Sequence, residues 1–420
     1  MNRILFLFTL ATGLLISCAS NTSDTSSSPE FNLTEGDWHM NLRIQEGVVL
    51  PVNLRVSKEG GGVISFINGT EVLEAHVEML SADSMRISMP YFESEFLAVS
   101  SNDGTRLEGS WYNLSKGPDY FIPFTAKYGA SSRFCDSGSL GLSLGMRYEV
   151  HFSPDSMNHH YPALGLFDKN SSDNSITGTF ATETGDYRFL QGNLCADTIK
   201  LSCFDGSHAF LFHAIVRGDS LVDGSFYSGK HWQEPWVAIA SSDFNLRDPY
   251  TLTHVVDSSA VGSTRFIMED GKTTTLAELK KENEVVILQI MGSWCPNCLD
   301  ESEYFKRLHG TYSARGLRIL PLCFEASEDP ETAYRAIHKL EEGLELPYPM
   351  YYGGKRSKSS AAEALPALDH IMSYPTSIFI DKKGKVRSVH TGFYGPSTGV
   401  YFDQYTSMTD GLIKELLSEN

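Results

Sequence analysis

The chain has 420 residues, of which 41% are hydrophobic and 20% are charged, and its formal net charge is −18. This length allows two or three domains, and its 24 Phe and 19 Tyr exclude a wholly disordered chain. The excess of 52 acidic over 34 basic side chains argues against a nucleic-acid partner, since phosphates are bound by clustered Lys and Arg. Seven cysteines are too few for a disulfide scaffold of this size, so each needs its own interpretation.

Residues 1–17 have the layout of a secretory signal, with Arg3 before a run of low polarity from Ile4 to Ile16. As a helix this run reaches about 20 Å, too short to span a membrane. It ends in Leu-Ile-Ser-Cys18, which resembles a bacterial lipobox, although an ordinary signal peptide with a chance cysteine is the alternative. We therefore expect a lipid anchor on Cys18, a flexible Ser/Thr-rich tether over 18–30, and a place in the bacterial envelope facing the periplasm, in either membrane.

Between Phe31 and Phe244 the sequence has short alternating runs of apolar and polar residues, separated by Gly, Asn, Asp and Ser. This pattern is typical of antiparallel strands, and no stretch keeps a helical period. Residues 80–89 can be aligned with 194–203, and 107–112 with 221–227. We predict a mostly antiparallel all-β region of two related units, 31–128 and 129–250, packed as two lobes or closed into one sandwich or barrel. Recurring Asp-Ser turns are the alternative explanation of the similarity.

From about residue 258, strand-like and helix-like segments alternate, which predicts an α/β domain with a partly parallel sheet over 258–420. The expected strands cover 265–270, 285–291, 317–324, 377–381 and 386–393. The expected helices run from Pro296 to about Tyr312, from near Pro330 to Leu340, and from about Phe402 to Leu417. An apolar stripe should pack the last helix on the sheet; it consists of Phe402, Tyr405, Met408, Leu412, Ile413 and Leu416.

The strongest chemical signal is Trp294-Cys295-Pro296-Asn297-Cys298, which lies between an apolar strand and a helix. Cys295 is expected to cap this helix, with Pro296 in the first turn, where the missing N–H costs no hydrogen bond. The free N–H groups and the helix dipole then favour a thiolate, the nucleophile of thiol–disulfide exchange. Cys298 follows one turn later, within reach to resolve a mixed disulfide.

Two other interpretations of this motif are disfavoured. A zinc site needs a second Cys or His pair, and the sequence has no other CxxC and no HxxxH. A purely structural disulfide is disfavoured because a CxxC at a helix start is typically redox-labile. We therefore expect no metal and no cofactor other than the redox-active pair Cys295 and Cys298.

Residues 285–298, followed by Ser373-Tyr-Pro-Thr-Ser-Ile-Phe-Ile-Asp381, resemble the thioredoxin fold and, within it, the TlpA/ResA-type thiol–disulfide oxidoreductases of bacterial envelopes. The resemblance covers about 258–420. It implies that Pro375 is a cis-proline beside the active-site sulfurs, an ordinary trans proline being the alternative. It also implies a set of substrate-binding residues, in which Tyr374 and Thr376 offer backbone groups to an extended substrate: Trp294, Pro296, Asn297, Tyr374 and Thr376.

One position departs from thioredoxin itself. Thioredoxin has a buried Asp six residues before the first cysteine, and Gln289 stands there in this sequence, where a neutral amide cannot act as a base. Proteins of the TlpA/ResA type often have a Glu three residues after the second cysteine, which is Glu301 here. This spacing puts Glu301 on the helix face of Cys298, able to relay its proton. A solvated surface acid is the alternative.

The remaining cysteines are expected to be structural. Cys323 ends an apolar strand and should pack in the core. Cys195 and Cys203 are eight residues apart, and a disulfide between them is possible in an oxidising compartment. Cys135 has no evident partner in the sequence.

We therefore expect a membrane-tethered disulfide reductase that acts on envelope proteins and is re-reduced by a membrane electron donor. One alternative is a thiol peroxidase of the AhpC/TSA type, although the segment Met291-Gly-Ser-Trp before Cys295 lacks the Pro and Thr of the peroxidase motif. The other is a client-binding β module with an accessory redox domain. Trp232 and Trp236 are its candidate surface aromatics, although such residues are more often core.

Overall fold

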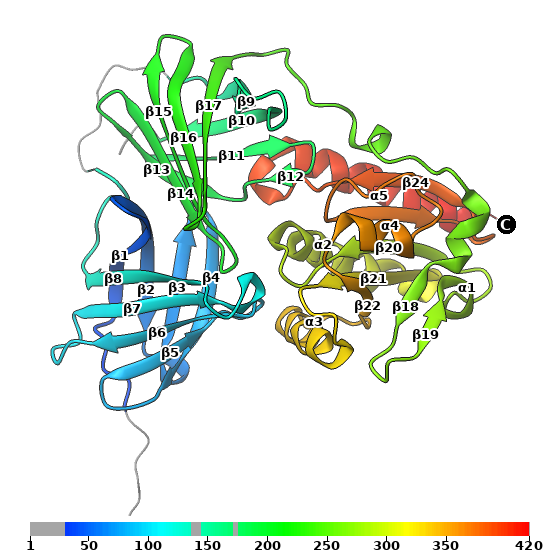
Figure 1. Ribbon diagram of the computed structural model, residues 1–420, viewed down its shortest axis with the longest axis horizontal. Coiled ribbons are helices and arrows are strands. Elements are labelled where there is room, and N and C mark those ends of the chain that lie inside the picture. Colours follow the sequence, from blue (N-terminus) through cyan, green and yellow to red (C-terminus); the bar gives the residue numbers. More distant parts are fainter. Residues whose placement is uncertain (1–29, 136–143, 171–174, 420) are drawn as a thin grey trace, which may run out of the picture.

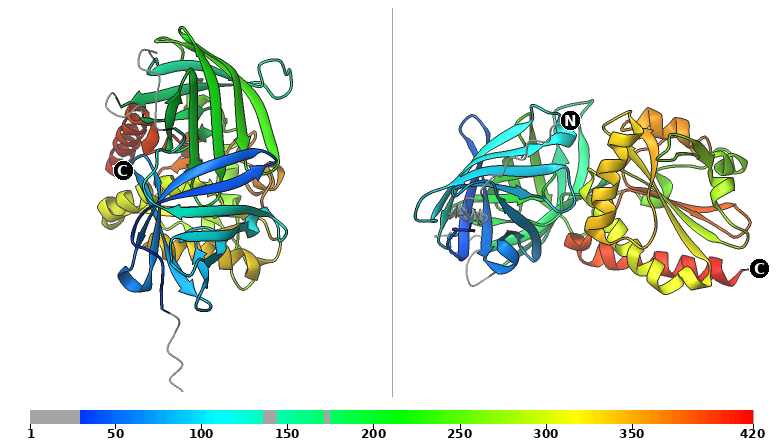
Figure 2. Two further views of the ribbon diagram at one scale, coloured as in Figure 1. Left: turned by 90° about the vertical axis from the view of Figure 1, so that its left-hand side faces the viewer. Right: turned by 90° about the horizontal axis from the view of Figure 1, so that it is seen from below.

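The structure is a computed structural model that describes residues 30–135, 144–170 and 175–419. Two β lobes lie against each other, and an α/β domain lies beside both of them (Figures 1 and 2). The expected signal segment and Cys18 fall outside the described residues. Within the described ranges, no helix is long and apolar enough to cross a membrane.

Lobe 1 is a closed barrel of eight antiparallel strands in sequence order, with β1 paired to both β2 and β8. Buried and more exposed residues alternate along the strands because one face of the sheet lines the core. The strands are β1 (Gly36–Gln45), β2 (Val48–Ser57), β3 (Val63–Asn68), β4 (Glu71–Met79), β5 (Ser84–Ser88), β6 (Ser94–Ser100), β7 (Arg106–Asn113) and β8 (Phe121–Tyr128).

Lobe 2 is a nine-stranded antiparallel sheet, eight strands of which form a second ring, since β10 pairs with β11 and β9 with β17. The short β12 stands outside this ring and pairs only with β11. The strands are β9 (Arg147–Phe152), β10 (Tyr161–Lys169), β11 (Ser175–Thr182), β12 (Gly185–Asp186), β13 (Leu190–Cys195), β14 (Thr198–Phe204), β15 (Ala209–Arg217), β16 (Ser220–Ser228) and β17 (Trp232–Ala240).

The two rings share one topology, and this topology agrees with the sequence repeat. Segments 80–89 and 194–203 fall on β5 and β14, each the fifth strand of its ring, and segments 107–112 and 221–227 fall on β7 and β16, each the seventh. The all-β prediction for this region is confirmed, and the region forms two lobes, not one sandwich.

The α/β domain has a seven-stranded sheet in the order β19-β18-β22-β21-β20-β23-β24, in which the neighbouring pairs β20–β21 and β21–β22 are parallel and the other pairs are antiparallel. Helices α2, α3 and α5 cover one face, and α1 and α4 cover the other. The elements are β18 (Arg265–Ile267), β19 (Thr273–Thr275), α1 (Leu276–Leu279), β20 (Val285–Met291), α2 (Pro296–Tyr312), β21 (Leu317–Glu325), α3 (Pro330–Leu344), β22 (Tyr351–Lys355), α4 (Lys358–Ala364), β23 (Thr376–Ile380), β24 (Val386–Thr391) and α5 (Val400–Ser418).

The predicted strands and helices of this domain are all present, and β20 and α2 have the expected bounds. Four short elements were not predicted: β19, α1, β22 and α4. Met408 was wrongly placed in the apolar stripe of α5, because it is 57% exposed. The two tryptophans differ, since Trp236 is buried in lobe 2 and Trp232 is exposed.

A buried arginine and a phenylalanine join the two lobes. Phe204, at the end of β14, packs in the core of lobe 1 against Phe66 and Trp111. Arg133 donates hydrogen bonds to the carbonyl oxygens of Ile67 in lobe 1 and Ser202 in lobe 2. The lobes therefore share a firm interface in addition to their covalent connection.

The cysteines of the β region pair differently from the expectation. Cys135 forms a disulfide with Cys195, while Cys203 is free and buried. In the β13–β14 hairpin Cys195 lies opposite Thr198, so Cys203 is five positions farther along the ladder, too far for a bond to Cys195. Cys323 is a free, buried core residue, as predicted.

Loss of the Cys135–Cys195 bond should cost about 2–4 kcal/mol of unfolding free energy, because the bond spans a sequence separation of 60 residues. Denaturant unfolding of Cys135→Ser, Cys195→Ser and the double variant measures this cost. The double variant should lose no more than either single variant, since all three lack the same bond. Additive losses would contradict the pairing.

Candidate functional site

The CPNC motif lies at the N-terminus of α2. Cys295 is the N-cap residue, Pro296 follows in the first turn, and the Cys298 N–H donates to Cys295 Sγ over 3.2 Å. Cys295 and Cys298 are joined in a disulfide. The N–H of the second cysteine and the positive end of the helix therefore both act on the sulfur of the first, which favours the thiolate in the reduced protein.

The loop before β23 packs on this sulfur. The Tyr374–Pro375 peptide bond is cis, and the Tyr374 carbonyl oxygen lies 3.6 Å from Cys295 Sγ. The Trp294 ring packs edge-on against Tyr374, and its indole N–H donates to the Phe324 carbonyl. Thr376 does not fit its expected role, because it is buried in β23 between β20 and β24 and its hydroxyl donates to the Ser373 carbonyl. It holds the loop in place and offers no group to a substrate.

Glu301 is fully buried, so the solvated alternative for this residue is wrong. Its carboxylate accepts hydrogen bonds from the Tyr405 hydroxyl (2.7 Å), the Ser377 hydroxyl (3.0 Å) and the Gln289 amide (2.9 Å). Burial raises the pKa of Glu301 to about 7, although these three donors act in the opposite direction. Gln289 also reaches the Cys298 carbonyl oxygen, so its amide links the helix turn of Cys298 to the carboxylate.

A cavity of about 320 Å³ lies on the other side of Tyr405, between α5, lobe 2 and the connector after it. Its wall includes Tyr405, His390 and Tyr250, whose rings pack in sequence. Burial lowers the pKa of His390 to about 4, so this imidazole is neutral at pH 7. A single hydrogen bond from Tyr405 thus joins the buried Glu301 to a space that can hold water.

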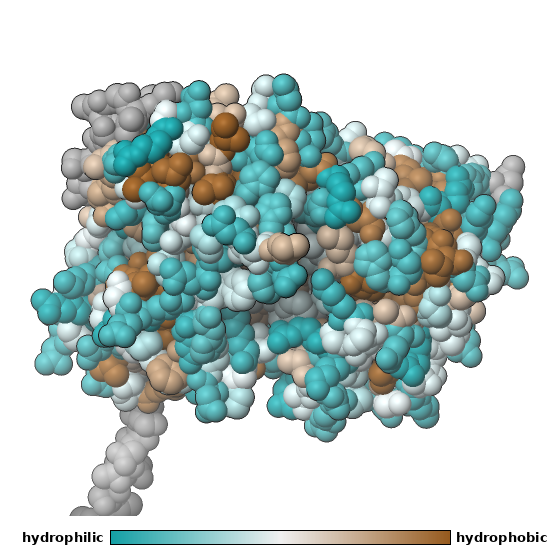
Figure 3. Space-filling model, turned by 45° about the horizontal axis from the view of Figure 1, so that its top comes forward, coloured by the Kyte–Doolittle hydropathy of each residue, from teal (hydrophilic) through white to brown (hydrophobic). Residues whose placement is uncertain are grey.

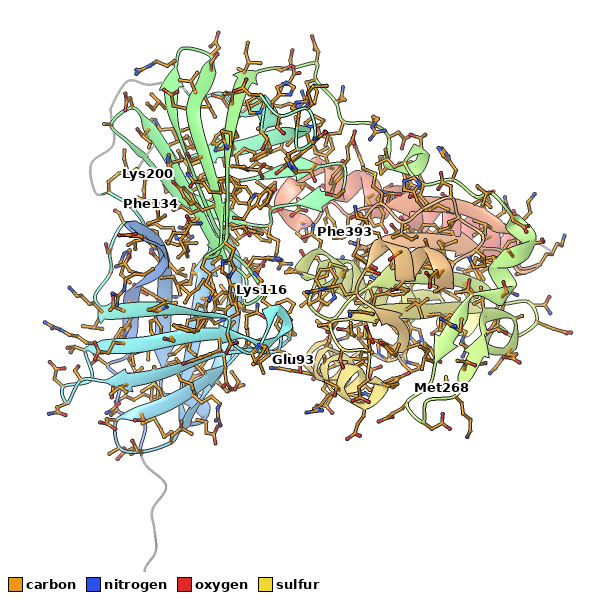
Figure 4. The ribbon with its side chains drawn as sticks, in the orientation of Figure 1. Glu93, Lys116, Phe134, Lys200, Met268 and Phe393 are labelled. Atoms are coloured by element: carbon orange, nitrogen blue, oxygen red, sulfur yellow. A yellow bond between two sulfur atoms is a disulfide. The ribbon has the colours of Figure 1, made fainter. Side chains whose placement is uncertain are left out.

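Lobe 2 covers the active-site face of the α/β domain. The turn around β12 lies directly against it: the Asn297 amide donates to the Asp186 carbonyl (3.1 Å), the Gly395 N–H to the Asp186 carboxylate (2.5 Å), and the Ser373 hydroxyl to the Thr184 carbonyl (2.6 Å). Phe393, which is labelled in Figure 4, lies where lobe 2 meets the α/β domain. A Cβ on Gly392 (φ +75°) would lie 2.9 Å from the Thr184 carbonyl carbon, so the two backbones approach as closely as a glycine permits.

Arg188 forms the charged centre of this interface and contacts all three parts of the chain. Its guanidinium, which belongs to lobe 2, pairs with Glu71 of lobe 1 and with Asp300 of α2, and donates to the Pro296 carbonyl inside the CPNC motif. Burial raises the pKa of Asp300 to about 7, against the effect of Arg188. The position of the active-site helix is therefore tied to both lobes.

A cavity of about 220 Å³ remains between lobe 2 and Cys295. Cys295, Trp294 and Tyr374 line it on one side, and Arg188, His208 and Phe210 line it on the other. His208 Nδ1 lies 3.2 Å from the buried Asp205 carboxylate, and burial lowers the pKa of this imidazole. No sequence motif identifies these lobe 2 residues, because they reach the site through the packing of the lobe.

Lobe 1 contributes a second contact at the edge of the site. Lys339 of α3 donates to the Phe92 carbonyl, and Phe92 packs with Leu299 and Tyr334 of the α/β domain. Glu93 and Lys116 lie on the side of lobe 1 that faces this domain (Figure 4). Among the described residues, no group of three or more His, Cys, Asp or Glu side chains is placed to hold a metal ion.

Known proteins with similar sequences match the C-terminal α/β domain. Residues 261–389 match the AhpC/TSA family. The chain is 30% identical to the thiol-disulfide oxidoreductase ResA of Halalkalibacterium halodurans over 131 residues, which are 30% of this chain and 65% of that protein. It is 25% identical to the thioredoxin-like protein YneN of Bacillus subtilis over 158 residues, 37% of this chain and 85% of that one.

Among solved structures, a putative thiol:disulfide interchange protein DsbE from Chlorobium tepidum is 18% identical and covers 39% of this chain and 99% of its own, with a TM-score of 0.30. The matched sequences, the WCxxC motif at the start of α2 and the proline loop beside it agree. The C-terminal α/β domain is thioredoxin-like and is similar in sequence to thiol-disulfide oxidoreductases named ResA.

Proposed function

We propose that this protein reduces disulfides of cell-envelope proteins through Cys295 and Cys298. The proposal rests mainly on one observation, the CPNC motif at the N-terminus of α2, with the proline loop against the sulfur of Cys295. Similarity to relatives named thiol-disulfide oxidoreductase supports the class of reaction. The redox-active pair needs no further cofactor, because both electrons come from the two thiols.

The first step is attack by the Cys295 thiolate on one sulfur of the substrate disulfide. The substrate S–S bond breaks, one substrate thiolate leaves and takes up a proton, and a mixed disulfide joins Cys295 to the rest of the substrate. The Cys298 N–H and the α2 dipole stabilise the attacking thiolate. The Tyr374 backbone beside Cys295 is the edge that an extended substrate would meet.

The second step is attack by Cys298 on the mixed disulfide, which releases the reduced substrate and forms the Cys295–Cys298 bond. Cys298 is fully buried, so its thiol must lose a proton inside the protein. Glu301 lies one turn further along α2, with a pKa near neutrality, and Tyr405 connects it to the cavity behind α5. We assign to Glu301 the acceptance of this proton, which then leaves through the Tyr405 side.

The tether belongs to the same proposal. A lipid on Cys18 would hold the protein at a membrane of the envelope, facing the periplasm, where a membrane electron donor re-reduces the Cys295–Cys298 disulfide. The β lobes would then extend the redox domain away from the lipid surface, since lobe 1 follows the N-terminal segment in the chain.

Replacement of Cys298 by Ser should stop the second step and leave substrates attached to Cys295. With the full-length reduced variant, we expect mixed disulfides that are stable without reductant, seen as mass additions on the peptide that contains Cys295. The Cys295→Ser variant is the matched control and should trap nothing. If the Cys298→Ser variant forms no mixed disulfide with any envelope protein or small disulfide, the proposed reductase activity is wrong.

Replacement of Glu301 by Gln should slow the release of substrate from Cys295 by about ten- to a hundredfold, because Cys298 loses its proton acceptor. Stopped-flow measurement of the two steps separates them, and the first step should change little. Glu303→Gln is the matched control, because Glu303 lies two residues along α2 and is exposed. Equal rates in the Glu301→Gln variant and the wild type would remove Glu301 from the mechanism.

The Glu301→Gln variant should also change the pH dependence of the free energy of unfolding. In the folded protein the pKa of Glu301 is about 7 instead of its usual 4.5, so the unfolded state gains relative stability as pH rises between these values. Between pH 4.5 and pH 8 the wild type should therefore lose about 3 kcal/mol of unfolding free energy relative to the Glu301→Gln variant. Unfolding curves across this range measure the difference, and Glu303→Gln should not show it.

The match to the AhpC/TSA family favours a thiol peroxidase as the second candidate. Peroxide reduction requires one thiolate that attacks the peroxide oxygen, and the Pro and Thr of the peroxidase motif are absent before Cys295. We therefore expect the reduced protein to consume hydrogen peroxide much more slowly than it reduces disulfides. Stopped-flow peroxide consumption tests this, and a faster reaction with peroxide would reverse the ranking.

A further inference from the structure

Cys295 is only 5% exposed, although it is the attacking residue of the proposed reaction. It lines the cavity of about 220 Å³ whose opposite wall is lobe 2. On the face shown in Figure 3, apolar residues form only small separate groups among polar ones, so this view shows no large docking patch. Access to the cavity therefore decides which substrates react.

The size of this cavity favours small substrates. Pockets for ordinary small ligands measure about 300–1,000 Å³, so this cavity of about 220 Å³ has room for no more than a small molecule. A disulfide in a folded protein brings two backbone segments with it. These segments need the space above Pro296 and the Tyr374–Pro375 loop, where residues 182–188 of lobe 2 already lie.

The contact between lobe 2 and the α/β domain has the properties of a separable interface. Each lobe and the α/β domain has its own hydrophobic core, and among the described residues only the cluster around Phe92 joins apolar side chains of the β region to the domain. The contacts at the active site are mostly hydrogen bonds and ion pairs. One connector, residues 241–257, joins the two parts, and its regular structure consists of one 3-10 turn at Pro249–Thr251 and a single bridge from Val255 to Leu368.

We propose that lobe 2 is a gate over Cys295: the closed chain admits disulfides of low molecular mass, and a folded protein client reacts only after lobe 2 moves away. This inference rests on the proposed function for the identity of the reaction, but the closure itself does not depend on it. In the closed form the Cys295 thiolate attacks a small disulfide, one small thiol leaves with a proton from solvent, and Cys298 displaces the second. Two electrons pass to the substrate, and the Cys295–Cys298 disulfide forms.

Closure can be measured without turnover, by the size dependence of alkylation at Cys295. We use the reduced full-length Cys298→Ser variant and compare iodoacetamide with a maleimide that carries a polyethylene glycol chain of several kilodaltons. Each rate is divided by the rate of the same reagent with glutathione, which removes intrinsic reactivity. We expect the normalised rate of the large reagent to be at least about tenfold lower, as for a site that opens only part of the time.

Substitutions in lobe 2 that weaken its contacts with the α/β domain should raise the alkylation rate of Cys295 by the large reagent and leave the rate with iodoacetamide unchanged. Asp186→Ala removes the acceptor of the Gly395 N–H, and Ser207→Ala removes the donor to the Trp294 carbonyl. Two lost hydrogen bonds should increase the open population by about tenfold or more. The matched control is Asp219→Ala with Ser220→Ala, in the turn after β15 and at the first position of β16, and it should behave as the parent.

The outcomes separate the gate from the reaction. Equal normalised rates for the large and small reagents would overturn the gate, whatever the enzyme activity. A size-dependent rate together with no reduction of either a small disulfide, such as cystine, or a folded protein disulfide would uphold the gate and overturn the proposed function. A wild-type protein that reduces the folded protein disulfide as fast as cystine would also overturn the gate.

Discussion

One buried guanidinium, that of Arg188, contacts all three parts of this chain. Arg188 of lobe 2 pairs with Glu71 of lobe 1 and with Asp300 of α2, and it binds the Pro296 carbonyl between the two active-site cysteines. Removing one partner of a buried ion pair costs about 3–5 kcal/mol, because the remaining charge is left without compensation. In the closed arrangement α2, lobe 1 and lobe 2 are therefore held together beside Cys295, and movement of lobe 2 away from α2 has to break the Arg188–Asp300 pair.

This arrangement changes the thioredoxin-like site in two ways. On the outer side, lobe 2 replaces solvent above Cys295 with a small cavity whose walls include Arg188 and His208. On the inner side, Glu301 is buried with three hydrogen-bond donors and connects through Tyr405 to a second cavity between α5 and the lobe. The substrate would therefore approach from one face of α2 while the proton of Cys298 leaves from the other.

The sequence was sufficient for the α/β domain because its signals are local. The run before Cys295 is apolar at almost every position and forms a fully buried strand, and Pro296 after a capping cysteine starts α2 where expected. The two related β units were also visible as a repeat. The Cys135–Cys195 pairing and the cover over Cys295 were not, because both depend on contacts between residues far apart in the chain. Glu301 was found, but the sequence patterns place Ser377 and Tyr405 only in a strand and a helix and do not show that both donate hydrogen bonds to its carboxylate.

The position of lobe 2 on the active-site face can be measured in solution. Amide hydrogen exchange of the full-length oxidised protein tests it most directly at the N–H groups of Gly395 and Arg188, which both donate to the Asp186 carboxylate. We expect slow exchange at both amides in the wild type and faster exchange at Gly395 in the Asp186→Ala variant. Exchange of the Gly395 amide at the rate of an unprotected loop in the wild type would contradict it.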